Sequence, residues 1–175
     1  MTGEPQRGAV IVMGVSGCGK STVGALLAER IGGHFADADA LHSPKSIEKM
    51  SQGTPLTDDD RWPWLDRVAA TIDASDGLPI IGCSALRRRY RDRLRAGAGR
   101  PVTFVHLDGT RAVLSQRMGE RAGHFMPTGL LDSQLATLEA LEPDERGIVV
   151  NIDADPERIV DDIVALLEVR ERTTA

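Results

Sequence analysis

The sequence is poor in aromatic residues, in cysteine and in long apolar runs, and each shortage excludes a class of protein. Phe, Trp and Tyr make up 3% of the 175 residues, and the two cysteines, Cys18 and Cys83, have neither zinc-site spacing nor the density of a disulfide-rich secreted domain. No apolar run approaches the roughly 20 residues of a membrane span, and residues 1–8 lack the apolar core of a signal peptide. We therefore expect reduced thiols, a cytoplasmic location and no membrane association.

Basic residues are also in deficit, because 21 Lys and Arg face 26 Asp and Glu for a net charge of -5. A protein that holds nucleic acid mainly through its phosphates carries the opposite sign. No nucleic-acid partner is expected, and the arginines crowded between positions 87 and 95 are expected to form a mostly solvated helix face. The length predicts a single domain over 1–175.

Short apolar runs alternate along the chain with segments that can form helices. The first run, 9–13, precedes a glycine-rich turn and a helical pattern over 20–31 that Gly32 and Gly33 close. Further apolar runs cover 35–38, 78–83, 102–107 and 148–152. This order predicts an α/β fold of three layers, with about five parallel strands flanked by helices.

Three further segments have local signatures. Thr57 followed by three aspartates predicts a helix start, and that helix should run to about residue 75. Apolar residues at helical spacing predict a last helix over 156–169. The stretch 119–129 is rich in glycine and charge and has no strand signal, so we interpret it as a mobile lid.

The turn after the first apolar run matches G-x-x-x-x-G-K-[ST], between a predicted strand and a predicted helix. In such a loop the backbone N–H groups and the helix dipole hold phosphates, Lys20 reaches the β and γ phosphates, and the Ser21 hydroxyl binds magnesium. Cys18 is expected to contribute its main chain and not a reactive thiol. The predicted ATP-binding residues are Gly14, Val15, Ser16, Gly17, Cys18, Gly19, Lys20, Ser21 and Thr22.

Features outside this loop favour a small-molecule kinase over a GTPase switch or a motor. The guanine-reading Asn-Lys-x-Asp pattern is absent, and the third apolar run ends in Cys83 and not in an acidic metal ligand. Asp37 and Asp39 follow the second run, and strand alternation puts both carboxylates on one face if the strand persists that far. We assign Asp37 to magnesium and Asp39 to the proton of an attacking hydroxyl, although the two roles could be reversed.

Seven blocks of sequence outside the phosphate loop form an ordered series. In chain order they are DADALH (37–42), IEKM (47–50), GTPLTDDDR (53–61), PWL (63–65), CSAL (83–86), YRD (90–92) and GHF (123–125). Together these blocks resemble the gluconate kinase family. The resemblance implies a fold like that of nucleoside-monophosphate kinases, ATP and Mg²⁺ as cofactors, transfer to the 6-hydroxyl of gluconate to give 6-phosphogluconate, and commonly a homodimer. Ser43 departs from the pattern, since proline is usual there.

The resemblance also implies roles for residues in a substrate-binding helical region at about 40–75 and beyond it. Arg61 would bind the gluconate carboxylate through a bidentate contact. Ser84 and one or two of three arginines would face the substrate pocket; these arginines are Arg87, Arg88 and Arg91.

Arg117 and Arg121 are four residues apart and share a helical face at the entrance to the predicted lid, where closure would bring them onto the transferred phosphoryl group. His124 in the lid is a further candidate for a substrate contact. Adenine contacts are expected near 152–156. The alternative to gluconate is another small metabolite such as shikimate, because its kinase would carry the same phosphate loop.

Overall fold

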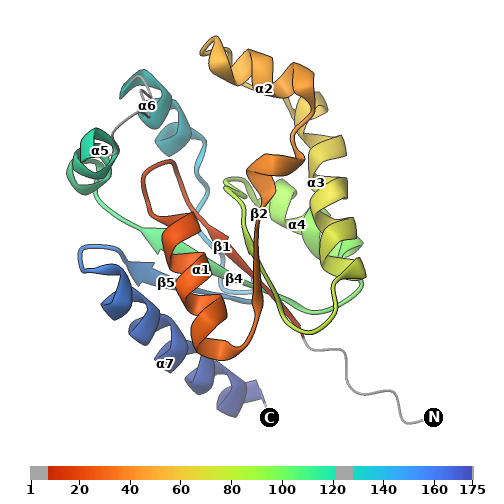
Figure 1. The fold of residues 1–175 in the computed structure, drawn as a ribbon, viewed down its shortest axis with the longest axis vertical. Coiled ribbons are helices and arrows are strands. Elements are labelled where there is room, and N and C mark those ends of the chain that lie inside the picture. The colour runs from red at the N-terminus through yellow and green to blue at the C-terminus, as the bar shows by residue number, and fades with distance from the viewer. Residues whose placement is uncertain (1–7, 121–127, 175) are drawn as a thin grey trace.

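Five parallel strands form one sheet in the order β2-β3-β1-β4-β5 (Figure 1). The structure is a computed structural model that describes residues 8–120 and 128–174. The predicted parallel α/β sheet is confirmed, and the observed strands lie within one or two residues of the expected ones. They are β1 (Ala9–Met13), β2 (His34–Asp37), β3 (Pro79–Gly82), β4 (Val102–Asp108) and β5 (Gly147–Asn151).

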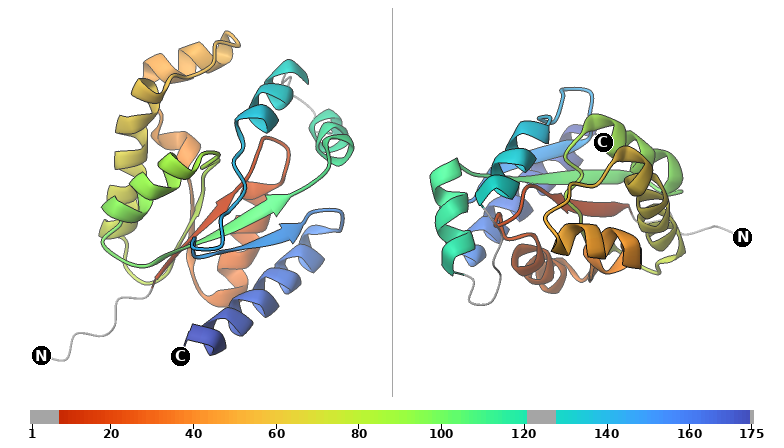
Figure 2. Two further views of the ribbon diagram at one scale, coloured as in Figure 1. Left: turned by 180° about the vertical axis from the view of Figure 1, so that it is seen from behind. Right: turned by 90° about the horizontal axis from the view of Figure 1, so that it is seen from above.

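Helices cover both faces of the sheet, which gives the three layers that Figure 2 shows from behind and from above. Helices α1 (Lys20–Ile31) and α7 (Pro156–Thr174) pack together on one face, and α3 (Asp58–Ala74) and α4 (Arg88–Gly97) pack on the other. The remaining elements lie beyond the carboxyl ends of the strands, at the top of Figure 1. They are the 3-10 helix η1 (Ala38–Leu41), α2 (Pro44–Ser51), α5 (Arg111–Glu120) and α6 (Thr128–Thr137).

The central strand β1 is apolar at every position because both of its faces are buried. Val10 and Val12 point into the core beneath α1 and α7, whereas Ala9, Ile11 and Met13 point into the core beneath α3 and α4. Strand alternation therefore divides one short apolar run between two cores, and it holds the end of β1 rigidly beside the glycine-rich turn.

Helix boundaries follow the local signals. Helix α1 ends at Gly32, which has a left-handed φ of 71° and donates its N–H to Ala28 O, as the predicted glycine stop requires. Helix α3 begins with a capping box in which Thr57 and Asp60 each accept a backbone N–H of the other. The last helix is longer than expected, because α7 continues to Thr174 and not to residue 169.

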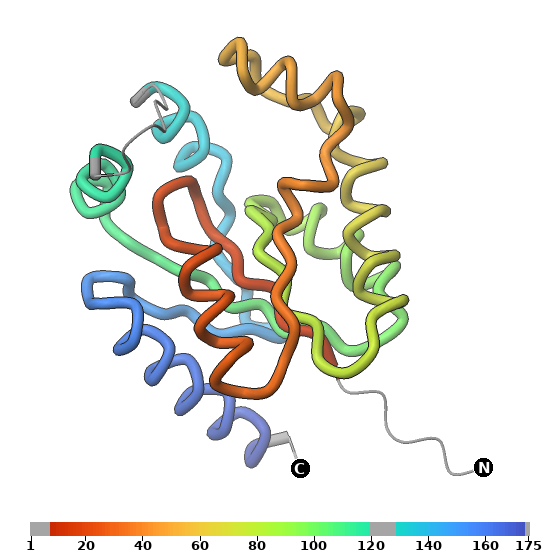
Figure 3. The backbone as a smooth tube through the Cα atoms, viewed as in Figure 1, coloured from red at the N-terminus to blue at the C-terminus, as the bar shows by residue number. Residues whose placement is uncertain are grey.

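Strand β2 does not continue through Asp39, which was the condition for placing the two aspartates on one face. The strand stops at Asp37, whose side chain accepts the N–H of Asp39 and so caps η1. Simple strand alternation therefore does not place Asp39, and a capped 3-10 turn sets its direction. The tube in Figure 3 shows how the chain turns sharply here and then climbs to α2.

Candidate active site

The phosphate loop joins the buried end of β1 to the start of α1. Gly17 and Gly19 have φ values of 84° and 95°, which side chains rarely adopt. A Cβ atom at Gly17 would also lie 2.7 Å from Met118 Cγ, so the loop packs closely beneath α5. Cys18 and Cys83 are both buried, and neither forms a disulfide in the described part of the chain.

Hydrogen bonds tie the start of the phosphate loop to the segment after β3 and to the side chain of Lys20. The Gly14 N–H donates to Ser84 O at 3.2 Å, which ties the start of the loop to the segment after β3. Lys20 Nζ donates to Gly14 O at 3.0 Å and to Val15 O at 3.2 Å, so the ammonium group lies inside the loop. The first N–H groups of α1 have no acceptor within the helix, and such groups form an anion site together with the helix dipole.

The predicted metal ligands lie in contact. Ser21 Oγ donates to Asp37 Oδ2 at 3.0 Å, although the two residues belong to different elements. Hydroxyl and carboxylate oxygens are ligands that Mg²⁺ accepts, usually together with waters and substrate phosphates. In residues 8–120 and 128–174, no cluster of three or more His, Cys, Asp or Glu side chains could hold an ion alone. The pair therefore fits a magnesium ion that ATP phosphates also coordinate.

Asp39 lies next to this pair, with its main-chain N–H 2.9 Å from Asp37 Oδ1. Its side chain is 72% exposed and free to meet an acceptor hydroxyl. Partial burial of the carboxylate raises the pKa of Asp39, repulsion from Asp37 raises it further, and Lys20 lowers it. The residue thus combines access to solvent with an affinity for a proton above that of an ordinary aspartate.

Sequence reasoning missed His42, which lies behind Asp39. Its ring stacks on Trp64 at 4.2 Å between centroids, and Nε2 is 4.0 Å from Asp39 Oδ1. Burial lowers the pKa of His42 to about 4, and Arg67 and Arg61 add repulsion. The imidazole is therefore neutral at pH 7. The only sequence signal was its membership in the block 37–42, because nothing local shows that Trp64 covers it.

Arg61 is held at the corner between α3 and α4. Its Nη1 donates to Tyr90 Oη at 3.0 Å, and its guanidinium lies 5.2 Å from the centre of the Tyr90 ring. Tyr90 Oη in turn donates to Asp58 Oδ1 at 2.6 Å, and Arg89 pairs with the other oxygen of Asp58 at 2.6 Å. These contacts orient Arg61 at the start of α3, and its side chain is 23% exposed.

The three arginine candidates after β3 have different surroundings. Arg91 is fully buried, donates to both oxygens of Glu145 at 2.7 and 3.0 Å, and also reaches Ala85 O at 3.0 Å. This placement argues against the predicted substrate contact, because every side of the guanidinium faces protein. Arg88 pairs with Asp144 at 2.7 Å, and Arg87 is partly exposed with Glu139 at 3.7 Å.

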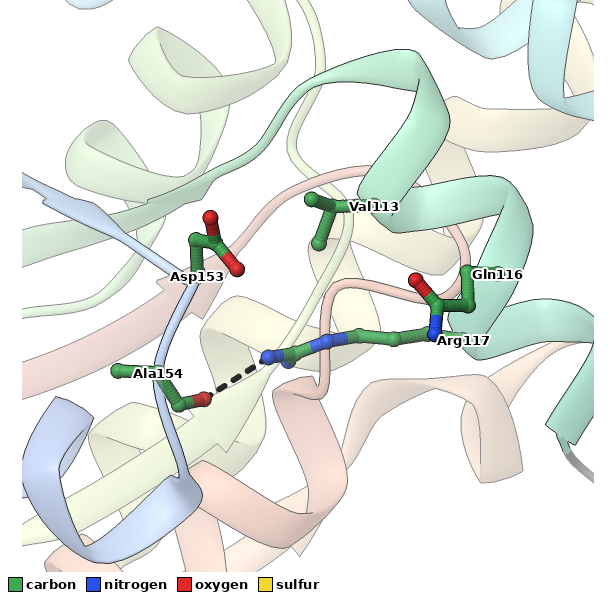
Figure 4. Close-up of a pocket in the computed structure, with 5 residues that line it drawn as sticks. All are labelled: Val113, Gln116, Arg117, Asp153 and Ala154. Atoms are coloured by element: carbon green, nitrogen blue, oxygen red, sulfur yellow. Dashed lines mark hydrogen bonds between the residues drawn. The ribbon is translucent and has the colours of Figure 1, made fainter.

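Arg117 lies in a pocket of about 230 Å³ beside the phosphate loop (Figure 4). The pocket is lined by Val113, Gln116, Arg117, Asp153 and Ala154. Arg117 donates to Ile152 O and, at 2.9 Å, to Ala154 O, so it joins α5 to the loop after β5. A Cβ atom at Gly19 would lie 3.9 Å from Arg117 Nη1, which places the guanidinium close to the phosphate loop as well.

Two further candidates, Arg121 and His124, lie outside the described residues, as does most of the predicted lid at 119–129. The described helices on either side are α5 and α6, which lie next to each other in Figures 1 and 2. No helix in the described part of the chain combines the length and apolar character needed to cross a bilayer.

A phosphate loop at the end of β1, two aspartates at the end of β2 and the strand order 2-3-1-4-5 define a P-loop kinase. The family model described as an AAA domain matches residues 10–141. Over 159 residues the chain is 47% identical to a gluconokinase of Gluconobacter oxydans, with 89% of this chain and 88% of the relative covered. The chain belongs to the gluconokinase family, and the resemblance seen in the sequence is confirmed.

Solved structures agree with this assignment. The fold matches a crystal structure of a gluconokinase from Sinorhizobium meliloti with a TM-score of 0.87 and 45% identity, over 98% of each chain. A shikimate kinase from Aquifex aeolicus matches with a TM-score of 0.57 at 17% identity, covering 93% of this chain and 98% of that one. The second likeness shows the fold alone, so it lends no support to shikimate as the substrate.

Proposed function

We propose that this chain transfers the γ-phosphoryl group of ATP to the 6-hydroxyl of D-gluconate and produces 6-phosphogluconate. The observation that carries the proposal is the contact of Ser21 with Asp37 and of Asp37 with Asp39, beside Lys20. This chain of contacts joins a phosphate-binding loop to an exposed carboxylate that can meet an acceptor. Family membership supports gluconate as that acceptor.

On the donor side, the main chain of residues 14–22 holds the phosphates and Lys20 moves onto the β and γ oxygens. Ser21 and Asp37 would hold Mg²⁺, which neutralises charge on the β and γ phosphates when it is bound. The Lys20 ammonium group already lies inside the loop, so the contacts it must exchange are two carbonyl oxygens and the Cys18 sulfur. The pocket around Arg117 and Ala154 supports a nucleoside site next to these phosphates.

On the acceptor side, Asp39 orients the 6-hydroxyl and takes its proton during transfer. Its raised pKa gives the carboxylate a higher affinity for that proton than an ordinary aspartate has. Arg61 binds the gluconate carboxylate, because a guanidinium held on one side by Tyr90 and Asp58 keeps donors for a planar anion. Ser84 and Arg87 complete this side, whereas Arg91 supports it from within the core.

Arg121 and His124 stay proposals for the closed complex, in which Arg121 would join Arg117 at the transferred phosphoryl group. A cytoplasmic location is also a proposal.

A homodimer is a further proposal. Three apolar side chains are exposed on β5 and α7 and support a surface for a second copy; they are Val149, Leu166 and Val169. Light scattering of the purified protein would measure the mass of the assembly, which for a homodimer is twice that of one chain.

An acceptor screen with coupled detection of ADP tests the proposed function. We expect gluconate to release ADP stoichiometrically in the presence of Mg²⁺, while shikimate and other polyol acids give background rates. Lys20→Met is the control for a contaminating kinase, since it removes the charge that reaches the phosphates. Turnover with another acid but not with gluconate would contradict gluconate as the substrate, while the chain would still be a small-molecule kinase. ADP release independent of every acceptor would contradict both.

A further inference from the structure

One side chain from outside the phosphate-binding motif contacts the main chain of the phosphate loop. Gln134, in α6, accepts the Ser16 N–H at its Oε1 atom at 2.7 Å, although 118 residues separate the two in sequence. The distance is at the short end of the range for an N–H···O bond. Only the oxygen of the side-chain amide can accept a hydrogen bond, so this contact also fixes which way the Gln134 amide is turned.

The contact matters because the first half of the loop has little regular hydrogen bonding of its own. The Gly14 N–H is bound by Ser84 O, and the Cys18 N–H closes a turn onto Val15 O at 3.3 Å. Between these two ties, the Ser16 N–H is held by Gln134 alone among the described residues. The curvature of the loop at this point therefore depends on a side chain that belongs to another element.

Residues before and after Gln134 in α6 pack against the core and against α5, and these contacts hold Gln134 in place. Leu131 is fully buried in the core beneath α1 and α7, and Leu135 packs against the same core. Asp132 pairs with Arg111 of α5 through two contacts of 2.6 and 3.0 Å. Gln134 thus extends from a packed helix, and its position is set before any nucleotide arrives.

The neutrality of this acceptor is also significant. A glutamate could accept the same N–H, but its carboxylate would lie at the edge of a loop that binds several phosphate charges. A leucine of similar size would leave the Ser16 N–H without this acceptor. Glutamine is the residue of this length that binds the amide and adds no charge.

We propose that Gln134 is a positioning residue of the ATP site: it holds the Ser16 arm of the phosphate loop in the shape that receives phosphates, through an acceptor that does not repel them. The proposal rests on the proposed use of ATP and is independent of gluconate. Gln134 acts through the loop main chain, so it should affect nucleotide binding more than acceptor binding.

Two variants test separately the hydrogen-bond acceptor of Gln134 and the absence of charge on it. Gln134→Leu removes the acceptor, and we expect the Kd of a non-hydrolysable ATP analogue with Mg²⁺ to rise about fivefold, the effect of one neutral hydrogen bond. Gln134→Glu keeps an acceptor and adds a charge, so we expect a rise of about tenfold or more at low salt that shrinks at high salt. Ser133→Ala, on the exposed side of the same helix, is the matched control and should bind the analogue like the wild type.

Calorimetry of the full-length variants measures these constants, and thermal melts show that each variant is folded. The KM for gluconate should stay within about twofold of the wild type. A Kd within twofold of the wild type for folded Gln134→Leu, or equal changes in the nucleotide and gluconate constants, would overturn the proposal. An unchanged Kd for Gln134→Glu would contradict the claim that residue 134 lies close to the bound phosphates. This variant still tests the proposal if Gln134→Leu does not fold. Because the analogue is measured without acceptor, a failure of gluconate turnover leaves this test intact.

Discussion

The nucleotide side and the acceptor side of the active site differ in which part of the polypeptide makes them. The nucleotide side is a continuous stretch whose main-chain N–H groups form the site, with glycines at left-handed φ values where the chain must curl. The proposed acceptor side is made of side chains from η1, α3 and the segment after β3, and contacts with other elements hold His42 and Arg61 in place. Trp64 of α3 covers His42, and Tyr90 of α4 holds Arg61.

The difference predicts how each side responds to substitution. Main-chain sites tolerate changes in side chains that point away from the ligand, and they depend on glycine and on the few groups that hold the loop. Sites made of side chains lose function through single substitutions, and they also depend on residues that never contact the ligand. The following variants test this contrast, from the largest expected effect to the smallest.

Asp39→Asn tests the acceptor side most directly. Removing the proton acceptor should reduce kcat by about 100- to 10,000-fold. The Kd for ATP should change by less than twofold, because Asp39 lies beyond the phosphate loop. Steady-state kinetics with gluconate and calorimetry with the ATP analogue measure the two quantities. Asp59→Asn, an exposed aspartate nearby on α3, is the control. Near-normal turnover of Asp39→Asn would remove this residue from the mechanism.

Arg91→Met tests whether a buried arginine supports the acceptor side without contacting substrate. The variant leaves Glu145 buried with Arg95 at 3.0 Å and the Glu142 N–H at 2.9 Å as its remaining partners, so the free energy of unfolding should fall by about 3 kcal/mol. Chemical denaturation measures this loss. Arg93→Met breaks an exposed pair with Asp66 and should cost about 1 kcal/mol or less. A higher KM for gluconate in Arg91→Met at unchanged stability would instead restore the predicted substrate contact.

Protonation of His42, on the acceptor side, should make the stability of the protein depend on pH. Its pKa in the folded protein is about 4, below the ordinary 6.5, so the unfolded chain binds more protons between these values. Stability should therefore fall as the pH drops from about 7 to 4, by up to about 3 kcal/mol from this residue. His42→Phe keeps a ring against Trp64 and should remove that part of the slope. His106, whose pKa burial also lowers, should leave a residual slope. An unchanged pH profile would contradict the buried neutral imidazole.

Arg61→Lys tests recognition of the substrate carboxylate. A lysine keeps the charge but loses the planar pair of donors, so the KM for gluconate should rise about tenfold while the KM for ATP stays within twofold. Arg89→Lys is a matched control, because Arg89 shares Asp58 and Tyr90 with Arg61 but is more exposed. Equal effects of Arg61→Lys on both constants would count against the assignment.

Much of the fold was predictable because its signals are local. The apolar run of β1, the glycine stop of α1 and the Thr57 cap of α3 each depend on a few neighbouring residues. The errors arose where local rules meet a turn. Alternation placed Asp37 and Asp39 on one face only if the strand continued through Asp39, and this condition is not met, because Asp37 caps a 3-10 helix and ends the strand.

The candidate site divides in the same way. A phosphate loop can be recognised from its eight residues, because the cradle is made by the main chain of those residues. The buried ion pair of Arg91 could not be predicted, because its partner Glu145 lies 54 residues away and no neighbouring residue indicates that the side chain is buried. Gln134 belongs to no motif, and His42 has only its membership in the block 37–42; each acquires its role through one long-range contact.

The sequence by itself therefore determined the class of fold, the phosphate loop and the family, because periodicity, glycine positions and ordered motifs are properties of neighbouring residues. The tertiary structure decided which polar side chains meet. It joined Ser21 to Asp37, directed Arg91 into the core and brought Gln134 to Ser16. These pairings depend on distances between segments remote in the chain, and only packing of the helices on the sheet sets those distances.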